Sequence, residues 1–236
     1  MKEKEWSQHI CFGESCKFYQ ENQNFFLGFF IKGNKNVRLL DLGCMDGEFT
    51  KKIANTVGTN KIYGVDINKT AAKKAEEKGI IVKNADLSNE LPFPDESFDV
   101  LSANQVLEHI WNTDKFFREI NRVLKKEGYA VISTPNLSCF HSIFFILLGQ
   151  QTPVVHLIDR QVGNFLRGTK VSSPQHFKAF NIPALRDLSE YYGFKVEMIK
   201  GFGFYFLPLF IQKFLSKFLG RYAVFITLRI RKIKKI

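Results

Sequence analysis

A largely apolar run that leads into two closely spaced glycines constrains the fold more than any other part of the sequence. Residues 37–42 have the composition of a parallel strand covered on both faces. Gly43 and Gly47 allow the backbone to bend sharply, and helical spacing begins at Glu48, an acid at the end of a helix where the dipole favours it. The sequence therefore predicts a strand, a turn and a helix, with room for a small ligand on the turn.

The spacing of the two glycines narrows the class of ligand. The dinucleotide fingerprint is G-x-G-x-x-G, and its second glycine makes room for a pyrophosphate. Here Met45 stands at that position, so the pattern is G-x-x-x-G. Asp46 and Glu48 also put two carboxylates where the pyrophosphate would lie. This arrangement is unfavourable for NAD but acceptable for a ligand that carries an ammonium and a sulfonium centre.

The stretch LLDLGCMDGEFT at residues 39–50 resembles motif I of the class I S-adenosylmethionine (SAM)-dependent methyltransferases, commonly written D-x-G-C-G-x-G. Met45 replaces the middle glycine of that motif. The resemblance implies that SAM is the cofactor and S-adenosylhomocysteine the product. It also implies four cofactor-binding residues in this stretch: Asp41, Gly43, Cys44 and Gly47.

Acidic residues at the ends of the next two predicted strands extend the resemblance. The strand predicted over 61–68 contains Asp66, 19 residues after Gly47, where the family has an acid that accepts hydrogen bonds from the ribose hydroxyls. The strand predicted over 80–87 ends in an acid that resembles the family residue beside the adenine amino group. The resemblance thus adds four cofactor-binding residues: Asp66, Ile67, Asp86 and Leu87.

The segment after the fourth predicted strand, 98–103, holds the first candidate for acceptor chemistry. Residues 91–100 resemble the L-P-F-x-D-x-S-F-D stretch of a subgroup that acts on small molecules and lipid precursors. Asn104 follows as a further cofactor-binding residue, and the [DN]-P-P-[YF] motif of amino-methylating families is absent, which argues against a DNA base as acceptor. His109 is the candidate general base, since imidazole titrates near neutrality. The alternative is that Glu108 and His109 only cap or pack the following helix.

The periodicity predicts a helix over 113–126 and a fifth strand over 129–136, whose T-P-N ending again resembles the subgroup. The predicted fold is a Rossmann-like, doubly wound seven-stranded sheet, mostly parallel, with an antiparallel last strand, an N-terminal helix and a lid. His176 lies in a segment that resembles the subgroup's H-x-R-x-F and is the second catalytic candidate. The predicted single domain, 1–236, has four parts: an N-terminal cap (1–36), a SAM-binding core (37–136), a lid insertion (137–180) and the C-terminal half of the sheet (181–236).

Cysteine spacing, the N-terminal sequence and net charge limit which partners and which cell compartment are expected. The four cysteines have no paired C-x-x-C spacing, so neither a disulfide framework nor a metal site is expected. The N-terminus is charged and lacks the apolar segment of a signal peptide, which favours a cytoplasmic protein. A net charge of +11 points to an anionic partner, either nucleic acid or a membrane surface. The basic residues are spread along the chain, and this makes nucleic acid the less favoured partner.

A helix predicted over 207–219 combines an aromatic face with a face of glutamine, serine and lysine, and a basic tail follows at 229–236. This combination is typical of a helix that lies on an anionic membrane. A core helix or a homodimer contact with a solvated tail explains the pattern equally well. Both interpretations stay open on the sequence alone.

The sequence therefore predicts a methyltransferase that acts by direct displacement on a small-molecule, lipid-precursor or glycan acceptor. An RNA methyltransferase is one alternative, suggested by the positive charge. A non-catalytic partner subunit with the SAM fold is another, suggested by Met45.

Overall fold

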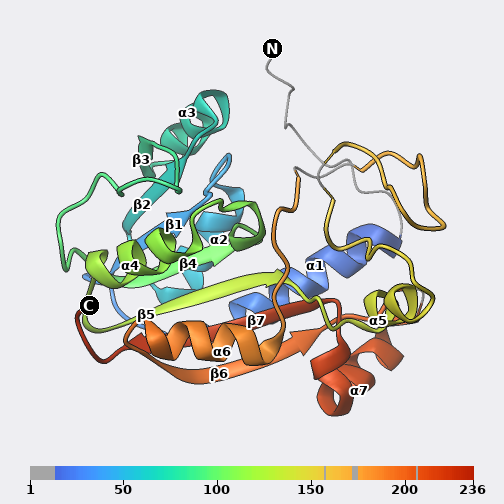
Figure 1. The fold of residues 1–236 in the computed structure, drawn as a ribbon. Coiled ribbons are helices and arrows are strands. Elements are labelled where there is room, and N and C mark those ends of the chain that lie inside the picture. Colours follow the sequence, from blue (N-terminus) through green and yellow to red (C-terminus); the bar gives the residue numbers. More distant parts are fainter. Residues whose placement is uncertain (1–13, 157, 172–174, 206) are drawn as a thin grey trace.

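Seven strands form one mixed sheet in the order β3-β2-β1-β4-β5-β7-β6, in which β7 runs antiparallel to both of its neighbours (Figure 1). The structure is a computed structural model that describes residues 14–156, 158–171, 175–205 and 207–236. The strands are β1 (Arg38–Leu42), β2 (Lys61–Asp66), β3 (Ile81–Asn84), β4 (Phe98–Asn104), β5 (Leu124–Pro135), β6 (Phe194–Phe202) and β7 (Phe225–Lys232). The predicted seven-stranded sheet with an antiparallel last strand is confirmed.

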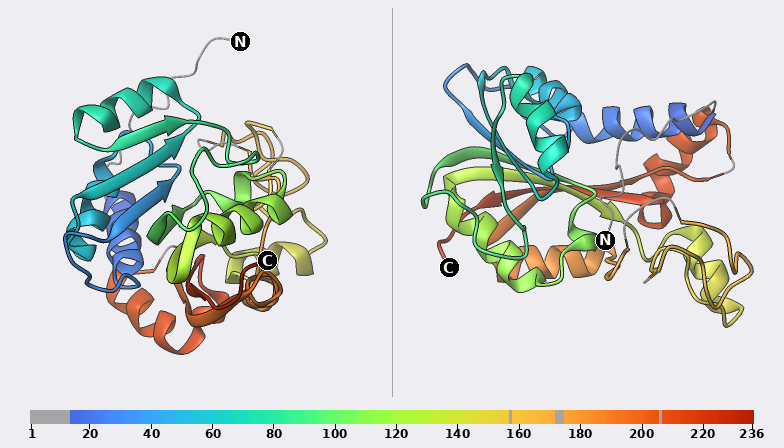
Figure 2. Two further views of the ribbon diagram at one scale, coloured as in Figure 1. Left: turned by 90° about the vertical axis from the view of Figure 1, so that its left-hand side faces the viewer. Right: turned by 90° about the horizontal axis from the view of Figure 1, so that it is seen from above.

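Helices cover both faces of this sheet because side chains alternate along its strands. On one face, α1 (Glu14–Leu27), α2 (Glu48–Val57) and α3 (Lys69–Glu77) pack on residues such as Leu39. On the other face, α4 (Thr113–Val123) and α6 (Ile182–Tyr191) pack on Leu40 and Leu42 (Figure 2). The strand order reverses between β1 and β4, so the carboxyl ends of these two strands flank the switch point where open α/β sheets bind ligands.

The predicted N-terminal helix is present, although the first 13 residues of the predicted cap, 1–36, lie outside the described residues. Helix α1 packs on the sheet through buried phenylalanines, of which Phe26 is fully buried and Phe29 is 2% exposed. The described part of the cap therefore serves as a layer of the core.

The fifth strand is longer than the sequence indicated. β5 starts at Leu124, where a helix was predicted to continue to residue 126, and Leu124 pairs with Phe98 of β4. Glu127 has a positive φ of 62°, and a Cβ at Gly128 would lie 2.9 Å from the Lys125 carbonyl oxygen. This local irregularity lets the strand continue through a sequence that has helical periodicity.

The predicted basic tail is wrong in its first half. Residues 229–232 belong to β7, where Arg229 and Arg231 both pair with Glu197 of β6. The Lys232 side chain is 1% exposed, and its Nζ donates to the Leu124 carbonyl oxygen at 2.7 Å. Cross-strand ion pairing and a buried carbonyl acceptor thus draw these cations into the sheet. The chain after β7 is also attached, because the N–H groups of Ile233 and Lys234 donate to the Gly193 carbonyl oxygen.

The segment predicted as a lid, 137–180, lies beyond the carboxyl ends of β4 and β5 (Figures 1 and 2). It contains α5 (Phe140–Leu147), and its other described residues follow an irregular path. Single bridges pair Asn136 with Phe180 and His156 with His176, which returns the segment to the end of the sheet.

Asn136 fastens the exit of β5 to the start of β7. It is fully buried, and its Nδ2 donates to the carbonyl oxygens of Arg221 at 2.9 Å and Ala223 at 2.7 Å. Its Oδ1 accepts from the Ser138 N–H at 2.9 Å. Asn136 is the last residue of the T-P-N motif. At least this part of the motif therefore has a structural role, because it connects the end of β5 to the start of β7.

We expect Asn136→Ala to lower the free energy of unfolding by about 2–4 kcal/mol, because two buried carbonyl groups and one N–H lose their partner. Urea denaturation followed by circular dichroism measures the change. Asn60→Ala, at an exposed asparagine, is the matched control and should change stability by less than about 0.5 kcal/mol. Equal effects of the two substitutions would contradict this account.

Candidate active site at the carboxyl end of the sheet

The turn between β1 and α2 has three residues in the left-handed region. Gly43, Met45 and Gly47 have φ of 76°, 49° and 79°. A Cβ at Gly43 would lie 2.7 Å from Val106 Cγ2, and one at Gly47 would lie 2.5 Å from Ile80 Cδ1. Both glycines are therefore required by space as well as by conformation. Met45 adopts a left-handed φ that costs most residues about 1–2 kcal/mol, which explains why the related motif has glycine here.

Asp66, at the end of β2, connects this turn to the neighbouring strand. Its Oδ2 accepts from the Met45 N–H and its Oδ1 from the Asn68 N–H, both at 2.8 Å. The residue is 5% exposed. A carboxylate has about four acceptor positions, so two positions remain for donors on a ligand.

Asp41 was predicted to bind the cofactor, and its carboxylate lies under the turn. It is 5% exposed, and its Oδ2 accepts from Thr50 Oγ1 of α2 at 2.5 Å. Burial raises the pKa of Asp41 to about 6, despite the opposing hydrogen bond from Thr50. Cys44 is also buried, and burial raises the pKa of its thiol, so it packs as a neutral group. These two residues support the turn.

Asn104 supplies an unpartnered acceptor at the switch point. It ends β4, whose preceding residue Ala103 is aligned with Leu42 at the end of β1. Its Oδ1 is buried and has no hydrogen-bond partner among the described residues. A buried acceptor without a donor is costly, so this oxygen fits a ligand that presents an N–H or O–H group between β1 and β4.

The remaining predicted cofactor residues lie at the same edge of the sheet. Ile67, just after β2, is 68% exposed. Asp86 is exposed, and its Oδ1 accepts from the Ser88 N–H at 2.8 Å, while Leu87 beside it is 9% exposed. The structure therefore brings all the predicted strand-end residues to one edge, with Asp86 and Leu87 beyond β3.

Lys78 weakens the argument that Asp46 and Glu48 would repel the pyrophosphate of a dinucleotide. Its Nζ lies 3.3 Å from Asp46 Oδ2 and 2.9 Å from Glu48 Oε1. One cation thus offsets part of the negative charge that two acids bring to the turn. The case against a dinucleotide rests more on the glycine spacing than on repulsion.

The two predicted catalytic histidines lie next to each other, 4.9 Å apart between ring centroids. His109 Nδ1 lies 2.8 Å from the Gln175 carbonyl oxygen, and His176 Nδ1 lies 3.0 Å from that of Val154. Burial lowers the pKa of both rings, that of His176 to about 4 with a further contribution from His109. Both imidazoles are therefore neutral near pH 7.

Glu108 is the functional candidate that the sequence analysis missed. It lies in the 3₁₀ turn Leu107–His109, is 1% exposed, and its Oε2 accepts from Thr134 Oγ1 at 3.0 Å. Burial raises its pKa to about 8. Asn112 caps α4 by accepting from the Lys115 N–H, so Glu108 and His109 do not cap this helix. The other half of that alternative, a packing role, is not decided by this hydrogen bond. The sequence feature that could have revealed Glu108 is its place directly beside a candidate catalytic histidine.

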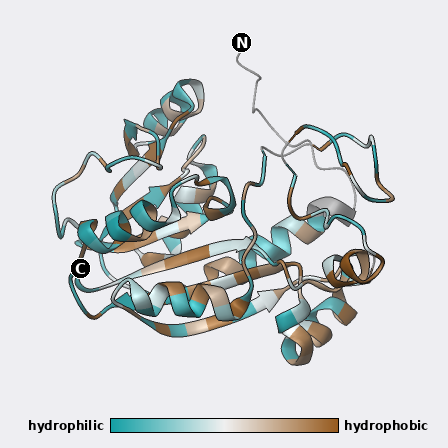
Figure 3. Ribbon diagram, in the orientation of Figure 1, coloured by the Kyte–Doolittle hydropathy of each residue, from teal (hydrophilic) through white to brown (hydrophobic). Residues whose placement is uncertain are grey.

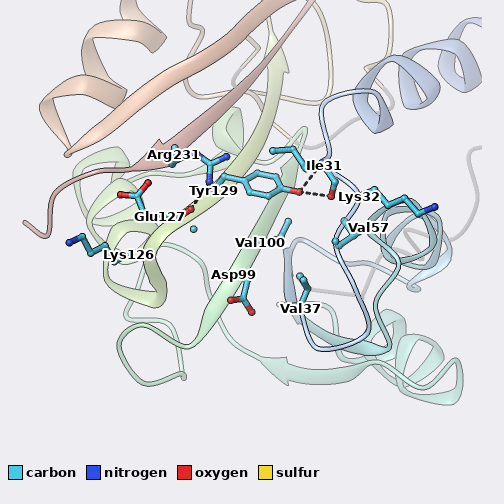
Figure 4. A pocket seen from close by; sticks show the side chains of 12 residues that line it. Ile31, Lys32, Val37, Val57, Asp99, Val100, Lys126, Glu127, Tyr129 and Arg231 are labelled. Carbon is cyan, nitrogen blue, oxygen red and sulfur yellow. Dashed lines mark hydrogen bonds between the residues drawn. The ribbon is translucent and has the colours of Figure 1, made fainter.

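A separate hollow of about 220 Å³ lies at the opposite end of the sheet (Figure 4). Its walls include Ile31, Asp99, Tyr129 and Arg231, at the amino ends of β1 and β4 and beside β7. None of the predicted site residues lines it. This hollow is therefore distinct from the carboxyl-end site.

The raised pKa of Asp41 predicts a pH dependence of stability. The folded carboxyl has a pKa of about 6 against an ordinary value of 3.8, so the folded state binds the proton more tightly than the unfolded state. The contribution of Asp41 to the free energy of unfolding should therefore fall as the pH rises from about 4 through about 6, by up to about 3 kcal/mol.

Asp41→Asn removes this titration, so the stability of the variant relative to the wild type should increase from about pH 4 to about pH 7. Urea denaturation without cofactor measures the difference at both pH values. The exposed Asp187→Asn is the control and should show a constant difference. A constant difference for Asp41→Asn would contradict the assignment.

Comparison with known proteins agrees with this geometry. Residues 40–132 match the family model described as a methyltransferase domain. A probable SAM-dependent methyltransferase of Mycolicibacterium smegmatis is 30% identical over 161 residues, which cover 67% of this chain and 52% of that protein. An uncharacterised protein of Methanocaldococcus jannaschii is 31% identical over 202 residues, which cover 83% of this chain and 76% of that one.

A demethylmenaquinone methyltransferase of Staphylococcus aureus is 29% identical over 128 residues, 51% of this chain and 53% of that protein. The chain thus spans about half the length of several of these relatives. A SAM-dependent methyltransferase from Mesorhizobium loti has the same fold, with a TM-score of 0.61 and 19% identity over 89% of this chain and 96% of that one. The motifs, the sheet order and these relatives together show that the chain belongs to the class I SAM-dependent methyltransferase family.

Proposed function

We propose that the protein transfers the methyl group of SAM to a small-molecule or lipid-like acceptor. The observation that carries this proposal is the presence of two acceptors on either side of the Gly43 turn, the Asp66 carboxyl and the unpartnered Asn104 Oδ1. The first offers free acceptor positions for ribose hydroxyls, and the second suits an ammonium group. The demethylmenaquinone enzyme among the relatives supports a small-molecule acceptor.

Each predicted residue has a place in this proposal. Asp66 would hold the ribose, Asn104 the amino group, and Asp86 with Leu87 the adenine, which would lie beside Ile67. Gly43 and Gly47 allow the left-handed backbone of the turn on which the ligand would lie. Asp41 and Cys44 act indirectly by supporting the turn from below.

When bound, SAM supplies a methyl group that is activated by its sulfonium. The chain's own contribution is alignment of the two reactants and control of the acceptor proton. His109 and His176 each have the Nδ1 proton directed at a backbone carbonyl, which leaves Nε2 unprotonated. An acceptor hydroxyl or amine between these rings and the turn could donate its proton to either Nε2.

Asp66→Ala should raise the dissociation constant for S-adenosylhomocysteine by roughly 10- to 100-fold, because charge-assisted hydrogen bonds to the sugar are lost. Isothermal titration calorimetry measures the binding, and a thermal unfolding scan establishes that the variant is folded. Asp187→Ala, on the exposed face of α6, should bind like the wild type.

Two results would reject the proposed function. The first is no binding of SAM or its product to the wild type, and the second is unchanged binding by a folded Asp66→Ala. With binding established, S-adenosylhomocysteine formation over a panel of quinone-precursor, lipid and glycan acceptors would identify the substrate class.

The surface of α7 (Leu209–Leu219) bears on the nature of the acceptor. Two of its polar residues face the protein: Gln212 Oε1 accepts from the Phe204 N–H at 3.1 Å, and Ser216 Oγ accepts from the Gly203 N–H at 3.2 Å. The phenylalanines are therefore turned outward. Phe210, Phe214 and Phe218 are 74%, 64% and 65% exposed.

Helix α5 adds a second apolar surface at the same end of the molecule (Figures 1 and 3). Phe140 and Leu147 are 70% and 79% exposed. Helix α7 carries two lysines and no acid. Among the described residues, no helix has both the length and the apolar character needed to cross a membrane. We infer that this end of the protein docks on an anionic membrane surface, which would give a lipid-like acceptor a short path to the site.

Phe210→Ser, Phe214→Ser and Phe218→Ser together should reduce partition onto anionic vesicles at least tenfold, since each buried phenylalanine contributes about 1.5–3 kcal/mol. Co-sedimentation at low salt measures the partition, and the exposed Tyr191→Ser on α6 is the control. Failure of the wild type to pellet would reject the docking. A loss of dimer in the triple variant would instead identify this face as a contact between copies.

A further inference from the structure

We propose that Glu108, His109 and His176 form a binding site for a divalent transition-metal cation. One ligand atom from each side chain lies within 4.8 Å of the other two. Glu108 and His109 come from the turn after β4, and His176 comes from the segment that returns before α6. The fold therefore brings together three metal-ligating groups that the sequence separates by up to 68 residues.

The tautomers of both histidines suit metal binding. The Nδ1 of His109 faces the Gln175 carbonyl oxygen at 2.8 Å, and the Nδ1 of His176 faces the Val154 carbonyl oxygen at 3.0 Å. A carbonyl only accepts, so each Nδ1 must carry the proton. Each Nε2 is then left with a lone pair. A metal-ligating histidine typically has its other ring N–H fixed in this way.

Glu108 supplies the oxygen ligand. Its side chain is 1% exposed, and Thr134 orients Oε2 by donating at 3.0 Å. Within the described ranges, no lysine or arginine forms an ion pair with this carboxylate. The ionised form of a buried carboxyl is unfavourable without a counter-charge, and a bound cation would supply that charge.

The alternative is that Glu108 and His109 lie together because they hydrogen-bond to each other, and the distance between them does not support it. The Oε1 atom of Glu108 lies 4.0 Å from His109 Nε2, which is beyond hydrogen-bond distance. The carboxyl oxygen of Glu108 and a ring nitrogen of each histidine therefore lie close together, and no hydrogen bond joins Glu108 Oε1 to His109 Nε2. Tetrahedral ligation at about 2.1 Å would need ligand atoms about 3.4 Å apart, so binding would draw the side chains together.

The donor set selects the class of metal. Two imidazole nitrogens and one carboxylate oxygen are the ligands of many catalytic zinc sites and of non-haem iron(II) sites. Magnesium and calcium prefer oxygen ligands throughout. Three protein ligands also leave at least one coordination position open for water or another oxygen.

One consequence depends on the proposed methyl transfer. A cation at this site would use both Nε2 lone pairs, so neither histidine would then act as a base. An acceptor hydroxyl bound at the open position would lose its proton more readily, because a metal ion lowers the pKa of a bound oxygen. A hydroxyl acceptor is therefore favoured over an amine.

The test uses tag-free protein treated with a chelator, without SAM or acceptor, so that its outcome is independent of methyl transfer. Titration with Zn²⁺ by calorimetry should show one site of micromolar or tighter affinity. Titration with Co²⁺ should produce visible absorption bands of a low-coordinate complex.

Glu108→Gln keeps the side-chain shape and removes the charge, and His176→Ala removes one ligand. Each should weaken Zn²⁺ binding at least tenfold, with folding checked by thermal unfolding without metal. His141→Ala, at a histidine outside the cluster, should bind like the wild type. No Zn²⁺ binding by the wild type would overturn the proposal. The proposal would also be overturned if folded Glu108→Gln and His176→Ala bound Zn²⁺ as tightly as the wild type. The same holds if His141→Ala lost as much affinity as these two variants.

Discussion

The hydrogen bond from the Met45 N–H to Asp66 Oδ2 is the interaction on which the site depends. It ties the turn after β1 to the end of β2, and it does so across a residue held at positive φ. The two backbone N–H groups that donate to this carboxyl group offset the cost of burying it. The same carboxylate can therefore serve the fold and still offer acceptor positions to a ligand.

The proposed acceptor side, at His109 and His176, is held in place in a different way. Its side chains are oriented by backbone carbonyls of the 154–176 segment, which fix one ring nitrogen of each histidine. The cofactor side rests on the regular sheet, whereas this side rests on an irregular segment that returns to the sheet through single bridges. A change in that segment would alter the acceptor chemistry and leave the cofactor turn intact.

Much of the core was predictable from the sequence because its signals are local. The apolar run before Gly43, the acid at position 66 and the alternation of strands and helices over 37–136 are properties of neighbouring residues, and they correspond to β1 to β5 in the structure. The errors came where a distant residue decided the outcome. Lys232 is buried because the Leu124 carbonyl accepts from it, and Lys78 offsets Asp46 and Glu48 from the end of α3.

The sequence by itself determined the fold class, the family and the edge of the sheet where we propose that SAM binds, since glycine spacing and hydrophobic period act over a few residues. The tertiary structure decided which face of α7 is exposed, because the backbone N–H groups of Gly203 and Phe204 take its polar side chains as partners. It also decided that Glu108 joins His109 and His176, because only the folded chain brings residues so far apart within ligand distance.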